Sequence, residues 1–379
     1  MKLLITQSNL TLKGGAERVV LKIAQHYKAK IYTAEYNPDA TFEGFRDLDV
    51  NVIGRLGPSS LSYGRVTQGL NYGLTFYNLK LKEDYDVINA HVSPSHWIRN
   101  NNPGVLWYCH TPLRDVYDLY NFRLSFKRVY EKPVYVLGAA AVRTMDKNVV
   151  KKIELVLANS KNTQTRLLKY LKKNSMVLNG GVDYKDYKQG DPQKYFLYPS
   201  RISPNKRQDY AINAFKLFRK SDSKFEGYKL ILVGDVSKDK FYYDYYKSIE
   251  RLAGDVGNVE LLTDVDDDKL KVLYAGSTGV LFTAINEDYG LIPLEAMASG
   301  KPIISVNEGG PKETVVNGKT GFLVNNEREM ANKMKFVAEH SSVARELGKN
   351  GTERVRRNYS WGVFFKKFDI ALEKVKKGD

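Results

Sequence analysis

The chain has 379 residues, and its length and composition bound the class of protein. Hydrophobic residues make up 42% and charged residues 27%, as in a globular chain with enough apolar material for two cores. The single cysteine, Cys109, excludes an intramolecular disulfide and fits a reducing cytoplasm. The net charge of +16 would suit nucleic acid, an anionic membrane surface or an anionic ligand. Because zinc-ligand spacing, RNP-like strands and Walker motifs are missing from the sequence, we expect no nucleic-acid partner.

Neither a signal peptide nor a membrane span is expected. Met1–Thr6 indicates a short strand, since its apolar run breaks at Gln7 and no cleavage-type region follows. The longest near-apolar stretch, Val134–Val142, is far shorter than the roughly 20 residues that cross a bilayer.

Short apolar runs alternate with helical patterns through both halves of the chain, which predicts α/β architecture with two doubly wound domains. In the first half the predicted strands are Lys2–Thr6, Lys30–Thr33, Val50–Ile53, Val87–Ala90, Val105–Tyr108 and Leu155–Ala158. In the second half they are Tyr195–Tyr198, Lys229–Val233, Val259–Leu262, Val280–Thr283 and Pro302–Val306.

The paired glycines in Val177–Tyr184 predict the break between a domain of residues 1–180 and a domain of residues 181–359. A last helix, residues 360–377, has Phe364, Phe365, Phe368 and Leu372 on one face. It either caps the second domain or packs back on the first.

The most informative segment is Glu287-Asp-Tyr-Gly-Leu-Ile-Pro-Leu-Glu295, which follows a predicted strand and begins a helix. Gly290 and Leu291 lie where the free N–H groups of the first helical turn would bind phosphate. Glu287 and Glu295 flank this position, and carboxylates there would bind hydroxyl groups rather than phosphate. The alternative is a first-turn Glu stabilised by the helix dipole and a solvated loop Glu.

The spacing of these two glutamates around Gly290, ahead of Glu295-Ala-Met-Ala-Ser-Gly-Lys-Pro302, resembles the donor-binding motif of glycosyltransferase family 4. The resemblance also covers Glu308-Gly-Gly-Pro-Lys-Glu-Thr-Val315 and Gly318-Lys-Thr-Gly-Phe-Leu323, and it is weak between Tyr32 and Tyr85. It implies the GT-B fold, with two Rossmann-like domains facing across a cleft and with the last helix, residues 360–377, packing back on the first domain. It also implies a retaining, metal-independent enzyme that uses a nucleotide-sugar donor and has no cofactor.

Arg201 and Lys206 follow the first predicted strand of the second half. Two cations at this position would neutralise a departing diphosphate without a metal, although surface loops also carry such residues. Their Arg-x4-Lys spacing resembles the family pattern, which implies a role in donor binding and catalysis. Arg207 is expected to be a neighbour rather than a ligand.

In the first half, Gly14 and Gly15 open a helix after the first strand, and they would allow a ligand close to the backbone or simply form a tight turn. The resemblance assigns them to the acceptor side, with Gly15 nearest the donor's distal phosphate. His110-Thr-Pro-Leu-Arg114 resembles a branch rich in mannosyltransferases, where the histidine lies by the transferred sugar and Arg114 is on the acceptor side. A turn histidine is the alternative, and Asp115 departs from the aromatic residue expected there.

The loop at Val265 and Asp267 corresponds to the family's contacts with the nucleobase. Asp267 would accept two hydrogen bonds from guanine, or else cap a helix N-terminus. The same run contains Asp264-Val-Asp266, which a metal-dependent GT-A enzyme would use as a metal ligand. Since Arg201 and Lys206 supply positive charge, we expect no metal site.

Phe122, Phe126, Val129 and Tyr130 share one face of a predicted basic helix, residues 122–132. Packing against the domain core is the favoured interpretation. The alternative is an amphipathic helix that rests on anionic lipid.

Taken together, the resemblance predicts a retaining transferase that moves a hexose, mannose from GDP-mannose, onto a saccharide or lipid-linked saccharide at the inner face of a membrane. The expected catalytic residues are Glu287, His110, Arg201 and Lys206. Glu287 is expected to bind sugar hydroxyls and Glu295 the ribose diol, and the leaving phosphate takes the acceptor's proton. The alternatives are a UDP-sugar transferase, a nucleotide-sugar epimerase or hydrolase, and a non-enzymatic basic adaptor.

Overall fold

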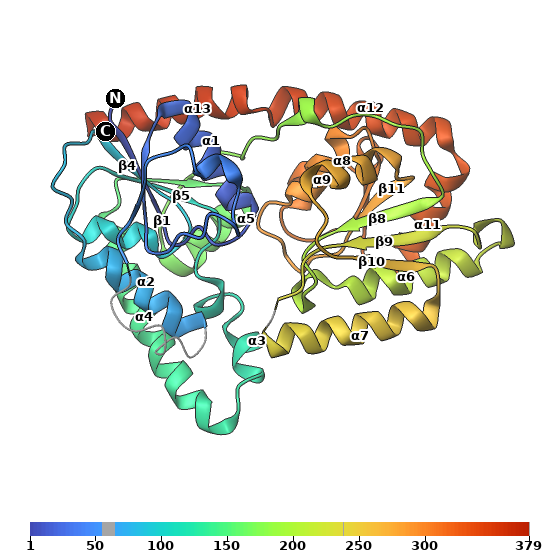
Figure 1. Ribbon diagram of the computed structural model, residues 1–379, viewed down its shortest axis with the longest axis horizontal. Coiled ribbons are helices and arrows are strands. Elements are labelled where there is room, and N and C mark those ends of the chain that lie inside the picture. Colours follow the sequence, from blue (N-terminus) through green and yellow to red (C-terminus); the bar gives the residue numbers. More distant parts are fainter. Residues whose placement is uncertain (55–64, 238, 379) are drawn as a thin grey trace. The chain divides into compact units, whose positions relative to one another are not determined.

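The computed structural model describes residues 1–54, 65–237 and 239–378, and the chain forms two compact units (Figure 1). Unit 1 comprises Met1–Gly180 and Phe364–Asp379, and unit 2 comprises Gly181–Val363. Each unit contains one sheet whose described strand pairs are all parallel, with helices on both faces.

The seven-stranded sheet of unit 1 has the order β3-β2-β1-β4-β5-β6-β7. Its strands are short and mostly buried, as is usual where helices cover both faces of a parallel sheet. Their bounds are β1 Leu3–Gln7, β2 Lys30–Thr33, β3 Val50–Val52, β4 Val87–Ala90, β5 Val105–Cys109, β6 Leu155–Ala158 and β7 Met176–Val177.

The helices of unit 1 cover this sheet, and α2 and α4 share a core with it that includes Phe76, Trp97, Trp107 and Val142. The helices are α1 Gly15–Tyr27, α2 Arg65–Asn78, α3 Tyr120–Ser125, α4 Lys132–Lys152, α5 Lys161–Arg166 and α13 Trp361–Lys377.

Helix α13 belongs to unit 1 from Phe364 onward. Phe364 and Phe368 are buried, and the Phe364 ring lies 5.8 Å from that of Tyr108 on β5. The Tyr27 hydroxyl on α1 donates to Asp369 at 2.7 Å. An apolar stripe and one charged hydrogen bond therefore fix this helix beside α1.

The six-stranded sheet of unit 2 has the order β10-β9-β8-β11-β12-β13. One core lies between the sheet and α6, α7 and α11, and a second lies on the side of α8, α9 and α12. The strands are β8 Tyr195–Pro199, β9 Lys229–Val233, β10 Val259–Leu262, β11 Gly279–Phe282, β12 Ile303–Val306 and β13 Gly321–Val324. The helices are α6 Gln208–Lys220, α7 Lys240–Val256, α8 Asp267–Gly276, α9 Leu291–Ala298, α10 Pro311–Thr314, α11 Glu327–Glu339 and α12 Ser341–Asn358.

Strand order reverses beside the first strand of each sheet, between β1 and β4 in unit 1 and between β8 and β11 in unit 2. In open α/β sheets, ligands bind beyond the carboxyl ends of the strands at such a switch point. The loops that follow β1, β4, β8 and β11 are therefore where the fold places a site.

Every strand predicted from the sequence is present, with ends displaced by at most one residue. The basic helix predicted at residues 122–132 is wrong. Helix α3 ends at Ser125, and a separate turn at Val129–Glu131 leads into α4, where Pro133 occupies the first helical turn. Because proline is tolerated only in a first turn, the chain starts a new helix there.

The expected burial of this segment in the core is also wrong, because Phe126, Val129 and Tyr130 are exposed. Across the described ranges, no helix combines the length and apolarity needed to span a bilayer.

Candidate active site

The loop after β8 brings two basic side chains to the switch point of unit 2. At the start of this loop, the Ser200 N–H donates to the Val233 carbonyl at the end of β9, at 2.7 Å. Arg201 is exposed, and with described partners it forms no ion pair. Lys206 ends a short 3-10 turn, Pro204–Lys206, and is partly buried. The loop therefore presents one solvent-facing cation and one sheltered cation.

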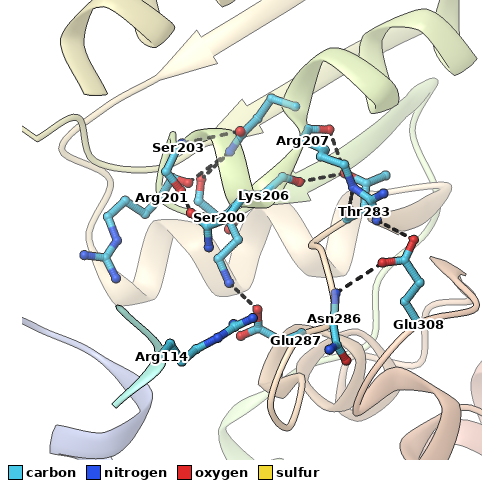
Figure 2. A network of polar contacts seen from close by, with 12 residues as sticks. Arg114, Ser200, Arg201, Ser203, Lys206, Arg207, Thr283, Asn286, Glu287 and Glu308 are labelled. Carbon is cyan, nitrogen blue, oxygen red and sulfur yellow. Dashed lines mark hydrogen bonds and ion pairs between the residues drawn. The ribbon is translucent and has the colours of Figure 1, made fainter. Parts of the chain in front are cut away.

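Lys206 forms an ion pair with Glu287, which follows β11 (Figure 2). The distance from Lys206 Nζ to Glu287 Oε2 is 2.7 Å. The backbones of the two loops are also joined, because the Ile285 N–H donates to the Asn205 carbonyl at 2.9 Å. Thr283 Oγ1 lies 2.8 Å from the Lys206 carbonyl and donates to it. The structure thus unites two site residues that the sequence places 81 positions apart.

Arg207 contacts the loop that follows β11 (Figure 2). Its Nε donates to the Thr283 carbonyl at 2.6 Å, and its Nη2 donates to Glu308 Oε1 at 2.9 Å. The second carboxylate oxygen of Glu308 accepts from the Asn286 N–H at 3.2 Å. Arg207 therefore holds the acidic loop in place.

Two glycines after β12 make room for the backbone of Glu287. Gly309 has φ +59°, and a Cβ atom there would lie 2.4 Å from the Glu287 carbonyl oxygen. The Gly310 N–H donates to that same oxygen at 2.8 Å. The Glu287 backbone consequently packs against a surface that only a residue without a side chain can form.

Helix α9 begins at the same edge of the sheet. Gly290 precedes it with φ +83° and, having no side chain, cannot itself cap the first turn. The N–H groups of Leu291 and Ile292 therefore belong to a helix end that favours an anion. This is the position expected of Gly290 and Leu291.

Glu295, one turn further along α9, is oriented by a residue that the sequence did not reveal. The hydroxyl of Tyr274, a buried residue of α8, donates to Glu295 Oε2 at 2.8 Å. The sequence gives no sign of this contact, since the two residues lie on different helices.

Tyr274→Phe is expected to raise the KM for the donor about 3- to 10-fold with little change in kcat, because one hydrogen bond to a carboxylate is lost. Initial-rate kinetics would measure both constants. Tyr195→Phe is the control, since the Tyr195 hydroxyl donates to the Leu273 carbonyl at 2.7 Å and contacts no carboxylate. An equal rise in KM in both variants would show that the effect is only structural.

The loop before α8 holds the residues expected beside a nucleobase. Val265 is partly buried, whereas Asp267 is exposed and is the first residue of α8. Asp266 is the N-cap, and its side chain accepts from the Lys269 N–H at 2.7 Å. Asp267 therefore does not cap this helix. Among the described residues, no three His, Cys, Asp or Glu side chains are grouped so as to hold a metal ion.

In unit 1, the residues predicted for the acceptor side follow β1 and β5, the two strands on either side of β4. Gly14 is the N-cap of α1, and Gly15 is its first residue. Arg114 forms an ion pair with Asp118 at 2.8 Å. Arg166 of α5 lies 3.6 Å from the same carboxylate, so Asp118 joins the loop after β5 to α5.

His110, just beyond β5, is hydrogen-bonded to His91, just beyond β4. His91 Nδ1 lies 2.9 Å from His110 Nε2, and His91 Nε2 lies 2.6 Å from Asn89 Oδ1. The Asn89 amide nitrogen donates to the Leu106 carbonyl at 3.1 Å, which directs its oxygen toward His91. His91 thus carries its proton on Nε2 and accepts on Nδ1 from His110 Nε2. His110 Nδ1 is left as an acceptor.

Asn89 and His91 were not identified from the sequence. A signal was available, because the chain has only five histidines and two of them lie within two residues of the ends of consecutive predicted strands.

Both histidines resist protonation. Burial lowers the pKa of His110 to about 3. Burial, and then the neighbouring His110, hold the pKa of His91 well below its ordinary value. In the unfolded chain these histidines take up protons near the ordinary histidine pKa of about 6.5. Above that pH they therefore cost no stability, and below it the free energy of unfolding falls as the pH drops toward 3.

His110→Asn is therefore expected to weaken the acid dependence of the free energy of unfolding, by at most about 1.4 kcal/mol per pH unit. Urea unfolding at about pH 7.5 and about pH 5.5 would measure the difference. His340→Asn is the control, since His340 is exposed. An unchanged slope for His110→Asn relative to the parent would contradict the expectation.

Two doubly wound units, one with cations and a helix N-terminus at its switch point, define a glycosyltransferase of the GT-B class. Solved structures agree with this fold. The structure of Alr3699/HepE of Anabaena in complex with UDP and glucose has a TM-score of 0.75 at 20% identity and covers 98% of this chain and 99% of that one. Sucrose-phosphate synthase from Thermosynechococcus elongatus has a TM-score of 0.79 at 18% identity, with complete coverage of both chains.

Two family models match consecutive parts of the chain. "Glycosyltransferase Family 4" matches residues 13–186, and "Glycosyl transferases group 1" matches residues 182–354. Alpha-1,3/1,6-mannosyltransferase ALG2 of Dictyostelium discoideum is 27% identical over 417 residues, which cover 96% of each protein. The chain belongs to glycosyltransferase family 4, and the family and fold predicted from the sequence are confirmed.

Proposed function

We propose that this glycosyltransferase is a retaining, metal-independent enzyme that transfers mannose from GDP-mannose to a saccharide or lipid-linked saccharide. The observation that carries the proposal is the grouping of Lys206, Glu287 and the first turn of α9 at the switch point of unit 2, with Arg201 on the loop of Lys206. A diphosphate and a sugar need this combination of positive charge and hydroxyl acceptors.

Unit 2 is the donor half in this proposal. Arg201, Lys206 and the α9 N–H groups bind the diphosphate, and Glu287 accepts from sugar hydroxyls. Glu295, held by Tyr274, binds the ribose diol, and Val265 and Asp267 border the base. No side chain of this set needs to change its protonation state for these contacts.

Unit 1 is the acceptor half, with Gly14, Gly15, His110 and Arg114 on the acceptor side. The unprotonated Nδ1 of His110 accepts a hydrogen bond from a hydroxyl of the transferred sugar or of the acceptor. With a pKa near 3, His110 stays neutral at physiological pH, so it serves as a hydrogen-bonding group rather than a proton donor.

In the proposed reaction, the bond from the sugar's anomeric carbon to the diphosphate oxygen breaks, and a bond to the acceptor oxygen forms on the same face. The acceptor's proton passes to the leaving phosphate. Arg201, Lys206 and the α9 dipole stabilise the negative charge that gathers on that phosphate, which is the role a metal fills elsewhere.

The choice of donor rests on relatives and needs a direct test. Mannose is supported by the name of the ALG2 relatives, whereas the HepE structure holds UDP and glucose. Asp267 is exposed at the start of α8, where a carboxylate would accept from the N–H edge of guanine. UDP-sugars are therefore the second candidate.

A thermal-shift panel of GDP-, UDP- and ADP-sugars is expected to show stabilisation by GDP-mannose above the others, at about 3 kcal/mol for a donor at 100 times its Kd. Glu295→Ala should lose most of this shift, because the ribose contact is gone. Glu250→Ala is the control, since Glu250 lies on the exposed surface of α7 and pairs with Lys247.

Failure of every nucleotide sugar to stabilise the parent would refute the donor site. Larger stabilisation by a UDP-sugar would replace mannose with the second candidate. An epimerase or hydrolase would consume the donor in the absence of acceptor, and NMR of the sugar's anomeric proton would show this.

A further inference from the structure

Unit 1 carries a concentration of exposed apolar side chains that the transfer reaction does not use. Six of the 15 large hydrophobic side chains exposed in the described chain lie between residues 126 and 137. The most exposed form what we call the apolar ridge, which consists of Phe126, Val129, Tyr130, Val134 and Leu137. Their exposed fractions are 55%, 82%, 69%, 66% and 71%, respectively.

The ridge follows from the way α4 begins. On the covered side of the helix, Tyr135, Ala139 and Val142 are buried. Val134 and Leu137 lie on the opposite side, and residues 133–142 contain no charged residue. An ordinary surface helix would place charged side chains there. The first turns of α4 are therefore apolar all round, although one side of them faces solvent.

Positive charge accompanies the ridge. Lys127, Arg128 and Lys132 lie within residues 126–137, and Glu131 is the only acidic residue in that span. Arg128 Nη1 donates to the Tyr130 hydroxyl at 2.8 Å, so one cation is held at the edge of the apolar surface. An apolar centre bordered by cations is the pattern of segments that lie in the interface of an anionic bilayer.

We propose that the apolar ridge inserts into the headgroup region of an anionic lipid bilayer, with Lys127, Arg128 and Lys132 contacting lipid phosphates. The side chains would enter to a depth of about 5–10 Å, which is enough to anchor the protein without spanning the bilayer. A bilayer fits better than a protein partner, because the ridge combines an exposed apolar surface with charge of one predominant sign.

Membrane binding through the ridge is separate from the proposed transfer and does not depend on it. It gives a physical reason for a lipid-linked acceptor, since an enzyme held at the bilayer would meet such an acceptor at high local concentration.

Co-sedimentation with vesicles tests the proposal. The parent should bind vesicles of phosphatidylcholine mixed with phosphatidylglycerol, and bind pure phosphatidylcholine at least ~10-fold more weakly. Val129→Glu with Leu137→Glu should weaken binding to the mixed vesicles ~10-fold or more, because two carboxylates replace the most exposed apolar groups. Arg128→Gln with Lys132→Gln should remove most of the preference for the anionic lipid.

Leu168→Glu with Ile370→Glu is the matched control, since both residues are exposed apolar residues of unit 1 outside the ridge, at 52% and 58%. It should bind vesicles as the parent does. In Val129→Trp, tryptophan fluorescence should shift to shorter wavelength only with anionic vesicles. The shift reports insertion even where the double variant folds poorly.

Three results would overturn the proposal: no vesicle binding by the parent, equal binding by the ridge variant, or equal loss in the control. Concentration-dependent dimers that only the ridge variant abolishes, with vesicle binding unaffected, would assign the ridge to a second copy of the chain instead. Donor-induced thermal shifts are measured without lipid, so failure here is separable from failure of the donor site.

Discussion

Lys206→Ala is expected to lower kcat for sugar transfer by about 100- to 1000-fold, because it removes a cation from the phosphate that gains charge as the sugar leaves. The substitution also leaves Glu287 without the 2.7 Å ion pair that orients it. Donor affinity should fall less than kcat, since charge on the phosphate is greatest in the transition state. Steady-state rates with saturating donor, in the presence of EDTA, measure this effect.

Two further variants separate the causes of this loss. Arg201→Ala removes a cation that with described partners forms no ion pair, so its effect reports diphosphate binding alone. Lys229→Ala removes an exposed lysine paired with Glu260 and should leave kcat within about 2-fold of the parent, because exposed ion pairs contribute little. A Lys206→Ala enzyme that kept a parental kcat would exclude Lys206 from catalysis.

Gly309→Ala is expected to displace Glu287 and lower kcat by about 100-fold, since shifts of about 1 Å in a catalytic group have effects of that size. The new methyl group would lie 2.4 Å from the Glu287 carbonyl oxygen and 2.6 Å from its nitrogen. The left-handed backbone at φ +59° adds strain, and together these should lower the free energy of unfolding by about 1–3 kcal/mol. Chemical denaturation and transfer assays would measure the two effects.

Gly318→Ala is a matched control for this substitution. Gly318 also has positive φ, at +73°, but a Cβ atom there would meet nothing within 4 Å. Backbone strain in Gly318→Ala should lower the free energy of unfolding by about 1 kcal/mol, and kcat should not fall. If both variants had the same kcat, displacement of Glu287 would not be the cause of the loss.

The sheets could be predicted from sequence because buried parallel strands are continuous apolar runs between helical patterns. Two strands were missed for physical reasons. β7 has only two residues, and β13 begins with Gly321, a residue that strands disfavour. Both are the last strand of their sheet, where pairing on one side is enough to hold a short segment.

At the candidate site, sequence reasoning named residues that the structure places at the switch point of unit 2, but not the residues that support them. Glu287 and Lys206 carry a recognisable spacing, whereas the Arg207 contact with Glu308 spans 101 positions. Tyr274 and His91 likewise act through partners from other elements. Such contacts depend on which strands become neighbours, and a single sequence gives the strands without their order.

The apolar ridge shows a different limit of the sequence. The spacing of Phe126, Val129 and Tyr130 predicts one helical face, but these residues do not share a helix, because α3 ends before them and α4 begins after them. The difference comes from Pro133, which restarts the helix, and from Tyr135, Ala139 and Val142, which occupy the covered side. Amphipathic spacing alone therefore gives neither the extent of a helix nor what its apolar residues contact.

The ion pair between Lys206 and Glu287 has a consequence for turnover under the proposed function. In the absence of donor, Lys206 already has a neutralising partner, so an incoming diphosphate must compete with a carboxylate for it. After transfer the same carboxylate competes with the nucleotide product. Glu287 thus serves as an internal counter-ion that weakens product inhibition. It lowers the affinity of the site for the donor, and for the same reason it speeds release of the nucleotide product.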